Sequence, residues 1–397
     1  MATISGEGAG GFRLRQQFAP IDPRGRHRLD WLDNLKVCLT ILVICHHCAI
    51  AFGARGSWYF VIPPRVESWD IPLMTLFVGI NQAFFMTLFF VIAAWFTPRS
   101  YDRKGAGAFL RDRLLRLGLP LVAYLVWLNP TVEWMTHRFE GVTDTSYQFF
   151  LWTYGYRFVG AGPLWFVEAL LLFALGYAAV RAIRSPPSPP QQPRPFPRPV
   201  AIFSFIFVMT LVVFVVRIAF PAGQVFAGLN LGEFPLYIAG WLLGVKAWRC
   251  GWMELIDRGR ARLWGGIALA FALVGPPALL IGGDPETAPL RIMGGWNALA
   301  FAYALWQCVL CLGISFTLIW VFREYLAGTG PLPRGMARSA YAAYIVHPVF
   351  VVAFTELVAN FPSAPLVHFM LLCPLAVISS FVTAEGLRRL PLLRQIL

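Results

Sequence analysis

Residues 35–52 form an apolar stretch, LKVCLTILVICHHCAIAF, that is long enough to cross a membrane yet contains two adjacent histidines. A helix of this length spans about 27 Å, close to the thickness of the hydrocarbon core of a bilayer. Lys36 lies near its start, and His46 and His47 lie deep inside it. An ionisable side chain at that depth is costly, so it is expected to face the protein interior and to serve a function. The stretch therefore predicts a membrane helix that carries part of a functional site.

Lys36 and His47 are expected on the same face of this helix. They are eleven positions apart, which corresponds to about 1100° of rotation, or three full turns plus roughly 20°. His46 is rotated by about 80° from Lys36 on the other side. The register therefore favours His47 over His46 as the partner of Lys36 in one site, with the lysine at one membrane surface.

The composition extends this conclusion to the whole chain, because 58% of the residues are hydrophobic and only 13% are charged. A soluble domain normally carries about 25% charged residues. The first thirty residues contain no apolar core followed by a cleavage site, so no removable signal peptide is expected. Ten apolar segments have membrane-spanning length: residues 35–54, 74–97, 114–134, 163–182, 200–220, 231–248, 263–281, 296–322, 337–359 and 365–384. The sequence thus predicts an all-α, polytopic membrane bundle of about ten transmembrane helices.

The distribution of Lys and Arg predicts the orientation of these helices. If the N-terminus is cytoplasmic and the ten segments alternate, most of the 33 Lys and Arg residues fall on the cytoplasmic side. Those that fall outside are Arg55, Arg65, Arg138, Arg157, Arg217 and Arg291. Both termini are therefore expected in the cytoplasm. Topology and anionic lipid headgroups account for the net charge of +13 without a nucleic-acid partner.

This orientation divides the chain into three parts. Residues 1–34 form a cytoplasmic N-terminal segment, residues 35–384 the ten-helix transmembrane domain, and residues 385–397 a cytoplasmic C-terminal tail. The domain includes a Pro-rich cytoplasmic linker at residues 185–199, for which a spacer is favoured over a recognition ligand. The aromatic outer loop at residues 136–162 is interpreted as packing at the membrane interface, or as a stacking surface for sugar rings.

Cysteine and histidine patterns indicate no metal or redox centre. Six of the seven cysteines fall inside apolar spans, where cysteine behaves as a small hydrophobic residue. Cys308 and Cys311 have the spacing of a redox motif, but no thioredoxin-like context surrounds them. No set of cysteines and histidines has zinc-binding spacing, so no metal is expected.

Three further clusters stand out against the apolar background. Arg113 and Arg116 share a face at the cytoplasmic end of the third span, where they form either a lipid-facing anchor or a bidentate clamp for phosphate. Glu168 lies inside the apolar start of the fourth span, where a carboxylate must be paired or protonated. Such a group can balance a histidine, position a hydroxyl substrate, or bridge two helices. In the ninth span, Tyr341, Tyr344 and His347 share one face of the helix. His347 is interpreted either as a functional residue or as a hydrogen-bonded packing residue.

Several motifs resemble those of acyltransferase family 3. Lys36, ten residues and then His47 resemble the family's signature, a basic residue and a histidine with that spacing in the first membrane helix. The other matching motifs are Phe89-Phe90-Val91-Ile92 with Phe96 and Ser100-Tyr101, Arg113-Leu-Leu-Arg116-Leu-Gly-Leu-Pro120, Leu164-Trp165-Phe166 with Glu168, and Tyr344-x-x-His347-Pro348. The chain departs from the family at Ala93-Ala94-Trp95, where many members have Ser-Gly, but these small residues still predict close helix packing.

The resemblance implies an integral membrane O-acyltransferase of the bacterial inner membrane. It would move an acyl group, acetyl or succinyl, from a cytoplasmic acyl-coenzyme A to a hydroxyl of an envelope glycan or other carbohydrate acceptor. His47 would act as general base or as an acyl-histidine, with Glu168 as a second catalytic residue. Within the family, the chain looks like the members called glucan biosynthesis protein C, which implies succinylation of periplasmic glucans.

The resemblance also implies roles for the remaining residues and partners. Lys36, Arg113 and Arg116 would bind the coenzyme A phosphates. The supporting residues, for substrate or for structure, would be Asp33, Trp165, Tyr344 and His347. The expected partners are membrane lipids, acyl-coenzyme A as co-substrate and the carbohydrate acceptor, with no permanently bound cofactor. The sequence does not determine the oligomeric state, and a homodimer is one of the alternatives.

A multi-span transporter or exporter of a polar or glycan substrate is the alternative function. Intramembrane charges and the interruption at Gly232 to Pro235 fit a transporter. However, the chain shows no internal pseudo-symmetry, and a transporter gives no reason for the Lys36–His47 register. A structural scaffold ranks third, because scaffolds have little reason to keep buried ionisable groups.

Overall fold

The computed structural model describes residues 29–62, 69–142, 146–154, 160–184, 194–226, 228–281, 288–328, 330–361, 363–391 and 393–396. These residues are mostly helical and contain no β-strand, which confirms the predicted all-α class. The α-helices are α2 (Asp30–Ala51), α3 (Asp70–Lys104), α4 (Ala106–Arg113), α5 (Leu119–Ala123), α6 (Asn129–Phe139), α7 (Tyr147–Tyr154), α8 (Trp165–Ile183), α9 (Pro199–Ala219), α10 (Phe234–Cys250), α11 (Arg258–Ile281), α12 (Ala288–Met293), α13 (Ala298–Tyr325), α14 (Pro331–Val358) and α15 (Pro365–Arg389).

Short helical turns complete the secondary structure. Two π-helical turns, η1 (Leu114–Gly118) and η2 (Tyr124–Leu128), join α4, α5 and α6 into one continuous helical segment. The 3-10 turns η4 (Gly162–Leu164) and η5 (Leu231–Glu233) precede α8 and α10, and η6 (Leu393–Gln395) follows α15.

Eight helical segments of the described chain are long and apolar enough to cross a membrane, so the fold is a polytopic membrane bundle. They match eight of the ten predicted spans. The two others, residues 231–248 and 263–281, are helical as α10 and α11 but are not among the eight. With 17 residues, α10 is shorter than the roughly 20 residues that normally cross a bilayer. The count of ten spans and the three-part division of the chain stay predictions, and residues 1–28 and 185–193 lie outside the described residues.

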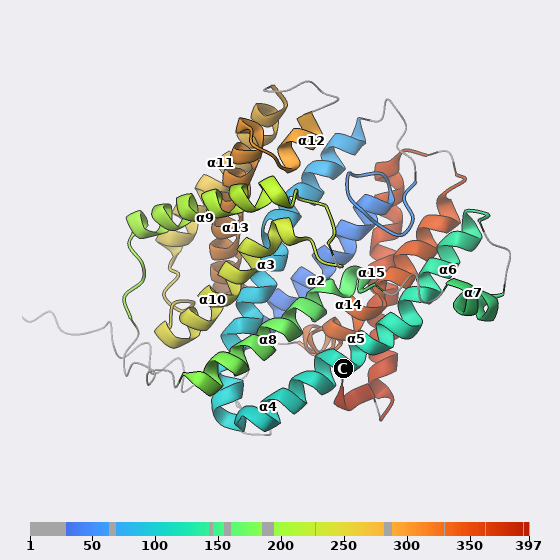
Figure 1. The fold of residues 1–397 in the computed structure, drawn as a ribbon, viewed down its shortest axis with the longest axis horizontal. Helices are drawn as coiled ribbons and strands as arrows, with labels where there is room; N and C mark the ends of the chain where they lie inside the picture. Colours follow the sequence, from blue (N-terminus) through green and yellow to red (C-terminus); the bar gives the residue numbers. More distant parts are fainter. Residues whose placement is uncertain are drawn as a thin grey trace, which may run out of the picture.

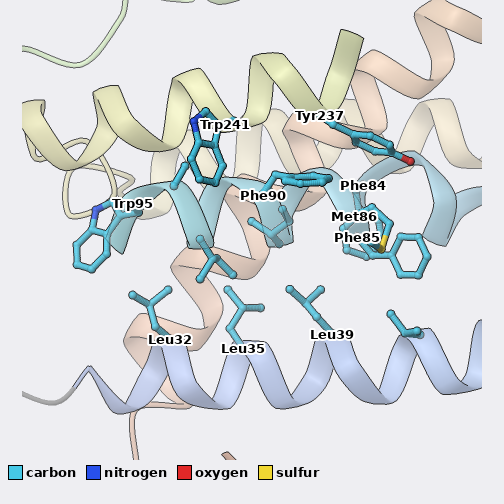
Figure 2. Close-up of a cluster of buried hydrophobic side chains, with 14 of the residues drawn as sticks. Leu32, Leu35, Leu39, Phe84, Phe85, Met86, Phe90, Trp95, Tyr237 and Trp241 are labelled. Atoms are coloured by element: carbon cyan, nitrogen blue, oxygen red, sulfur yellow. The ribbon is translucent and has the colours of Figure 1, made fainter. Parts of the chain in front are cut away.

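Helices α2 and α3 lie between the group of α9 to α13 and the pair α14 and α15 (Figure 1). Leu32, Leu35 and Leu39 recur along one face of α2 and point toward α3. Figure 2 shows Phe84, Phe85, Phe90 and Trp95 of α3 in the same cluster, with Tyr237 and Trp241 of α10 on its other side. His47 lies on a different face of α2, which points toward α14.

Small residues bring α3 and α10 close together. A Cβ atom on Gly244 would overlap the carbonyl oxygen of Val91 and lie 2.8 Å from the Cβ atom of Ala94. A Cβ atom on Gly240 would lie 2.7 Å from Cγ2 of Thr87. Such small-residue contacts let membrane helices approach closely. The close packing expected at Ala93-Ala94 is therefore present at Ala94.

A buried ion pair ties α9 to the start of α10 and to α13. Nη2 of Arg217 lies 2.6 Å from Oε1 of Glu233, and both side chains are almost completely buried. Gln307 bridges them, because it accepts from the Arg217 guanidinium and donates to Glu233 at 2.5 Å. Removing one partner from such a pair leaves an uncompensated buried charge, so these three side chains fix how the helices meet.

Candidate active site

Two histidines from distant parts of the chain meet inside the bundle. Nδ1 of His47 on α2 lies 2.8 Å from Nε2 of His347 on α14. The two rings are nearly parallel, at 6°, with centroids 5.1 Å apart. His347 is fully buried and His47 is partly buried. The structure thus joins the two histidines that sequence analysis placed in separate spans.

The hydrogen-bond chain beyond His347 determines which nitrogens carry protons. Nδ1 of His347 lies 2.6 Å from the carbonyl oxygen of Tyr344, which can only accept, so this nitrogen donates. With neutral rings, Nε2 of His347 is then an acceptor, and Nδ1 of His47 donates to it. This assignment follows from the partners, and it leaves Nε2 of His47 as an unprotonated base.

Pro348 makes the Tyr344 carbonyl available for this chain. In an α-helix that carbonyl would accept from the backbone N–H four residues later, at position 348. Proline has no N–H, so Pro348 inside α14 leaves the oxygen free for the His347 ring. The His-Pro sequence therefore fixes the ring of its own histidine through local backbone chemistry.

An aromatic segment after α2 covers His47. The Trp58 ring stacks on the His47 ring, with centroids 4.1 Å apart and an interplanar angle of 21°. His46 instead packs against Phe85 of α3 with centroids 5.0 Å apart, and its Nδ1 is buried without a hydrogen-bond partner. The two adjacent histidines thus face different surroundings, as the helical rotation predicts.

The turn before α8 is tied to the histidine helix. The Tyr344 hydroxyl donates to the carbonyl oxygen of Pro163, while the Tyr344 carbonyl accepts from His347. Tyr59, next to Trp58, bonds to the Tyr124 hydroxyl at 2.7 Å and donates to Oδ1 of Asn129. The first bond thus ties the start of α8 to α14, and the other two tie the covering segment to the η2–α6 region.

Glu168 and Trp165 lie on α8, and neither makes a hydrogen bond, ion pair or ring contact with His47 in the described structure. Glu168 is partly buried and makes no hydrogen bond or ion pair with any residue that the structure describes. Trp165 stacks on Tyr237 with centroids 5.3 Å apart, and its neighbour Phe166 meets Tyr344 edge-on. Trp165 is therefore placed for packing, and the catalytic role of Glu168 stays a prediction without a direct link to the histidines.

Lys36 lies at the other end of α2. Its Nζ is 2.7 Å from Oδ1 of Asp33 and 5.6 Å from the centre of the Phe96 ring on α3. Because α2 is continuous, the eleven residues from Lys36 to His47 correspond to about 16 Å along the axis. Asp33 thus holds Lys36 in an ion pair, and the binding of a donor phosphate by Lys36 stays a prediction.

Arg113 and Arg116 lie where α4 passes into a π-helical turn. Arg113 ends α4 and Arg116 lies in the π-helical turn η1, so the regular α-helical geometry changes between them. The Arg113 guanidinium lies 5.0 Å from the centre of the Phe109 ring, and its Nε is buried without a partner. Arg116 is exposed and lies 3.2 Å from Oδ1 of Asp112. Their role in donor binding stays a prediction.

Sequence analysis missed Trp58, Tyr59, Tyr124 and Asn129. The aromatic run Trp58-Tyr59-Phe60, so soon after a histidine-bearing helix, is the signal that points to a cover. Tyr124 and Asn129 carry no local signal, because only the packing of η2 and α6 brings them to Tyr59. No group of three metal-ligating side chains occurs among the residues that the structure describes.

Comparison with known protein families identifies the chain. A family model described as an acyltransferase domain matches residues 29–385, which include both histidines and all the motifs named above. No curated protein and no solved structure matches the chain significantly. The match covers most of the chain and confirms the expected family. The protein therefore belongs to acyltransferase family 3.

Proposed function

We propose that this membrane acyltransferase transfers an acyl group from a cytoplasmic acyl-coenzyme A to a hydroxyl group of an envelope carbohydrate. The observation that carries the proposal is the chain from the Tyr344 carbonyl through His347 to His47. It leaves Nε2 of His47 as a base of defined orientation, held under Trp58. Membership of an acyltransferase family favours the enzyme over the transporter.

The reaction needs only one proton carrier. The acceptor hydroxyl attacks the thioester carbonyl, and Nε2 of His47 takes the hydroxyl proton as the new C–O bond forms. The tetrahedral intermediate then collapses and the C–S bond breaks. His47 returns the proton to the departing sulfur, so coenzyme A leaves as the thiol. Positive charge that develops on His47 during the first step is shared with His347 through their hydrogen bond.

The position of the base along α2 fits substrates that arrive from opposite sides. His47 lies four residues, or about 6 Å, before the end of α2 at Ala51, and about 16 Å from the level of Lys36. A donor anchored by its phosphates at Lys36 would reach His47 with its thioester end. The acceptor would then approach from the end covered by Trp58 and Tyr59.

The identity of the acyl group and of the acceptor stays a prediction. An acetyl or succinyl group is expected, the latter by resemblance to glucan biosynthesis protein C, and the inner membrane is the expected location. The test is to delete the gene and compare envelope glycans by mass spectrometry. A glycan should lose an acetyl or succinyl mass and regain it with the wild-type gene, but not with the His47→Ala gene. Unchanged acylation of every envelope glycan after deletion would contradict the proposal.

A further inference from the structure

A cavity separate from the histidine site lies between α3, α9, α10 and α13. It has a volume of about 310 Å³ and is lined almost entirely by apolar side chains, among them Ile206, Met209, Leu236 and Phe316. Pockets that hold small molecules have volumes of about 300–1,000 Å³. It shares no residue with the site around His47, so it is not explained by the reacting groups.

The cavity has a polar end. Lys246 lines it and is exposed, and it makes no hydrogen bond or ion pair within the described part of the chain. Its Nζ lies 5.1 Å from the centre of the ring of Trp252, another lining residue. The Trp252 indole nitrogen is buried and has no hydrogen-bond acceptor. A cation and an unused N–H donor therefore meet at one end of an apolar space.

These features define the chemistry of an occupant. The apolar walls of the cavity favour an apolar chain as the occupant, because they offer few hydrogen-bond partners to a polar one. At the end near Lys246 the occupant must accept hydrogen bonds and carry negative charge, as a phosphate does. A neutral lipid would leave the ammonium without a counter-charge. A short hydrophilic anion would leave the apolar walls empty.

We propose that the cavity binds one acyl chain of an anionic phospholipid, whose phosphate accepts hydrogen bonds from Lys246 and Trp252. Positive-inside topology places Lys246 near the cytoplasmic leaflet, where anionic headgroups attract basic residues. The site lies between α10 and α9, so a bound lipid would fill the space that the helices leave between them.

Photo-crosslinking of the full-length protein in vesicles tests this proposal. The probe is phosphatidylglycerol with a photoreactive group in one acyl chain, and crosslinked peptides are located by mass spectrometry. We expect crosslinks in α9, α10 and α13, and competition by unlabelled phosphatidylglycerol but not by phosphatidylcholine. Lys246→Gln should weaken crosslinking about tenfold, because a charged hydrogen bond is lost. The control Arg262→Gln removes the same charge from an exposed position outside the cavity.

A steric pair of variants separates the cavity from the outer surface. Ala239 lines the cavity, so Ala239→Phe should block the crosslinks, whereas Ile238→Phe on the exposed face of α10 should preserve them. Equal loss in Lys246→Gln and Arg262→Gln would overturn the headgroup site. Crosslinks that persist in Ala239→Phe, or that phosphatidylcholine or an isoprenoid phosphate competes away better than phosphatidylglycerol, would overturn the phospholipid assignment.

Discussion

At the scale of single residues, Tyr344 links the histidine pair to the turn before α8. Its carbonyl oxygen orients the His347 ring, and its hydroxyl holds the Pro163 carbonyl at the start of α8. His347 in turn orients His47. A general base needs a fixed tautomer to be effective. These hydrogen bonds fix the tautomer of His47 without any carboxylate partner.

His47 rather than His46 should carry the chemistry. His47→Ala should lower turnover by about 10²–10⁴-fold, the typical contribution of a general base, in protein that still inserts into the membrane. His46→Ala should keep measurable activity, because His46 faces Phe85 and not His347. Release of free coenzyme A thiol by purified protein measures both. If the His47→Ala protein retained more than about a tenth of wild-type turnover, the role of His47 as base would be wrong.

Pro348→Ala tests whether the free carbonyl matters. The new backbone N–H would compete with His347 for the Tyr344 oxygen, and the orientation of both rings would become less defined. Since one hydrogen bond contributes about 0.5–1.5 kcal/mol, turnover should fall between about twofold and tenfold. Pro374→Ala in α15 is the control, because that proline also lies inside a helix but is exposed. Equal turnover in the two variants would refute the tautomer argument.

At the scale of elements, prolines and π-helical turns decide where polar backbone groups point. Pro120 has no N–H, so the carbonyl of Arg116 in η1 lacks its usual helical donor. The Tyr341 hydroxyl donates to it at 2.9 Å and so binds α14 to η1. Tyr341 and Tyr344, one turn apart on α14, therefore each donate to a backbone carbonyl of a neighbouring segment, η1 and η4 respectively.

Arg113 should act on the donor. Its guanidinium lies over Phe109 and keeps a buried Nε without a partner, so Arg113→Ala should raise the Michaelis constant for acyl-coenzyme A about tenfold. The constant for the acceptor should change little, and Arg113→Lys should recover only part of the effect. The same measurement on Arg116→Ala asks whether the exposed arginine contributes. Arg111→Ala at an exposed position of α4 is the control. Unchanged donor binding in Arg113→Ala would leave membrane anchoring as its role.

Gly162 should be essential for the geometry of the cover. It has φ of +45°, and a Cβ atom there would overlap the Tyr59 hydroxyl and lie 3.2 Å from that of Tyr124. Gly162→Ala should therefore displace Tyr59 and the adjacent Trp58 from His47, and lower turnover at least about tenfold. Gly160→Ala is the matched control, because a Cβ atom there meets nothing within 4 Å. Similar activities in the two variants would show that the cover is not needed.

At the scale of the whole molecule, α2 packs against several other long helices of the bundle. It contacts α3, α13, α14 and α15, so one helix presents Lys36 at one end of the bundle and His47 toward the other. In the proposed function, these two ends of α2 would meet the donor and the acceptor from opposite sides of the membrane.

The orientation of the bundle can be measured directly. Single cysteines introduced at positions 103, 191 and 258 should be labelled only from the cytoplasm, and those at 144, 284 and 360 only from outside. The alternating Lys and Arg content motivates this prediction. Labelling of position 191 from outside would remove one span and contradict the ten-helix arrangement.

Sequence alone determined the helical class, the approximate position of each membrane helix and the family, because all three depend on local apolar runs and on spacings within single helices. It also separated His47 from His46, since that choice depends only on helical rotation. Only the tertiary structure joined His47 to His347, placed Trp58 over them, and showed that a π-helical turn begins directly after Arg113. Those contacts join residues up to 300 positions apart or depend on π-helical turns, and no local pattern encodes which helix faces will meet.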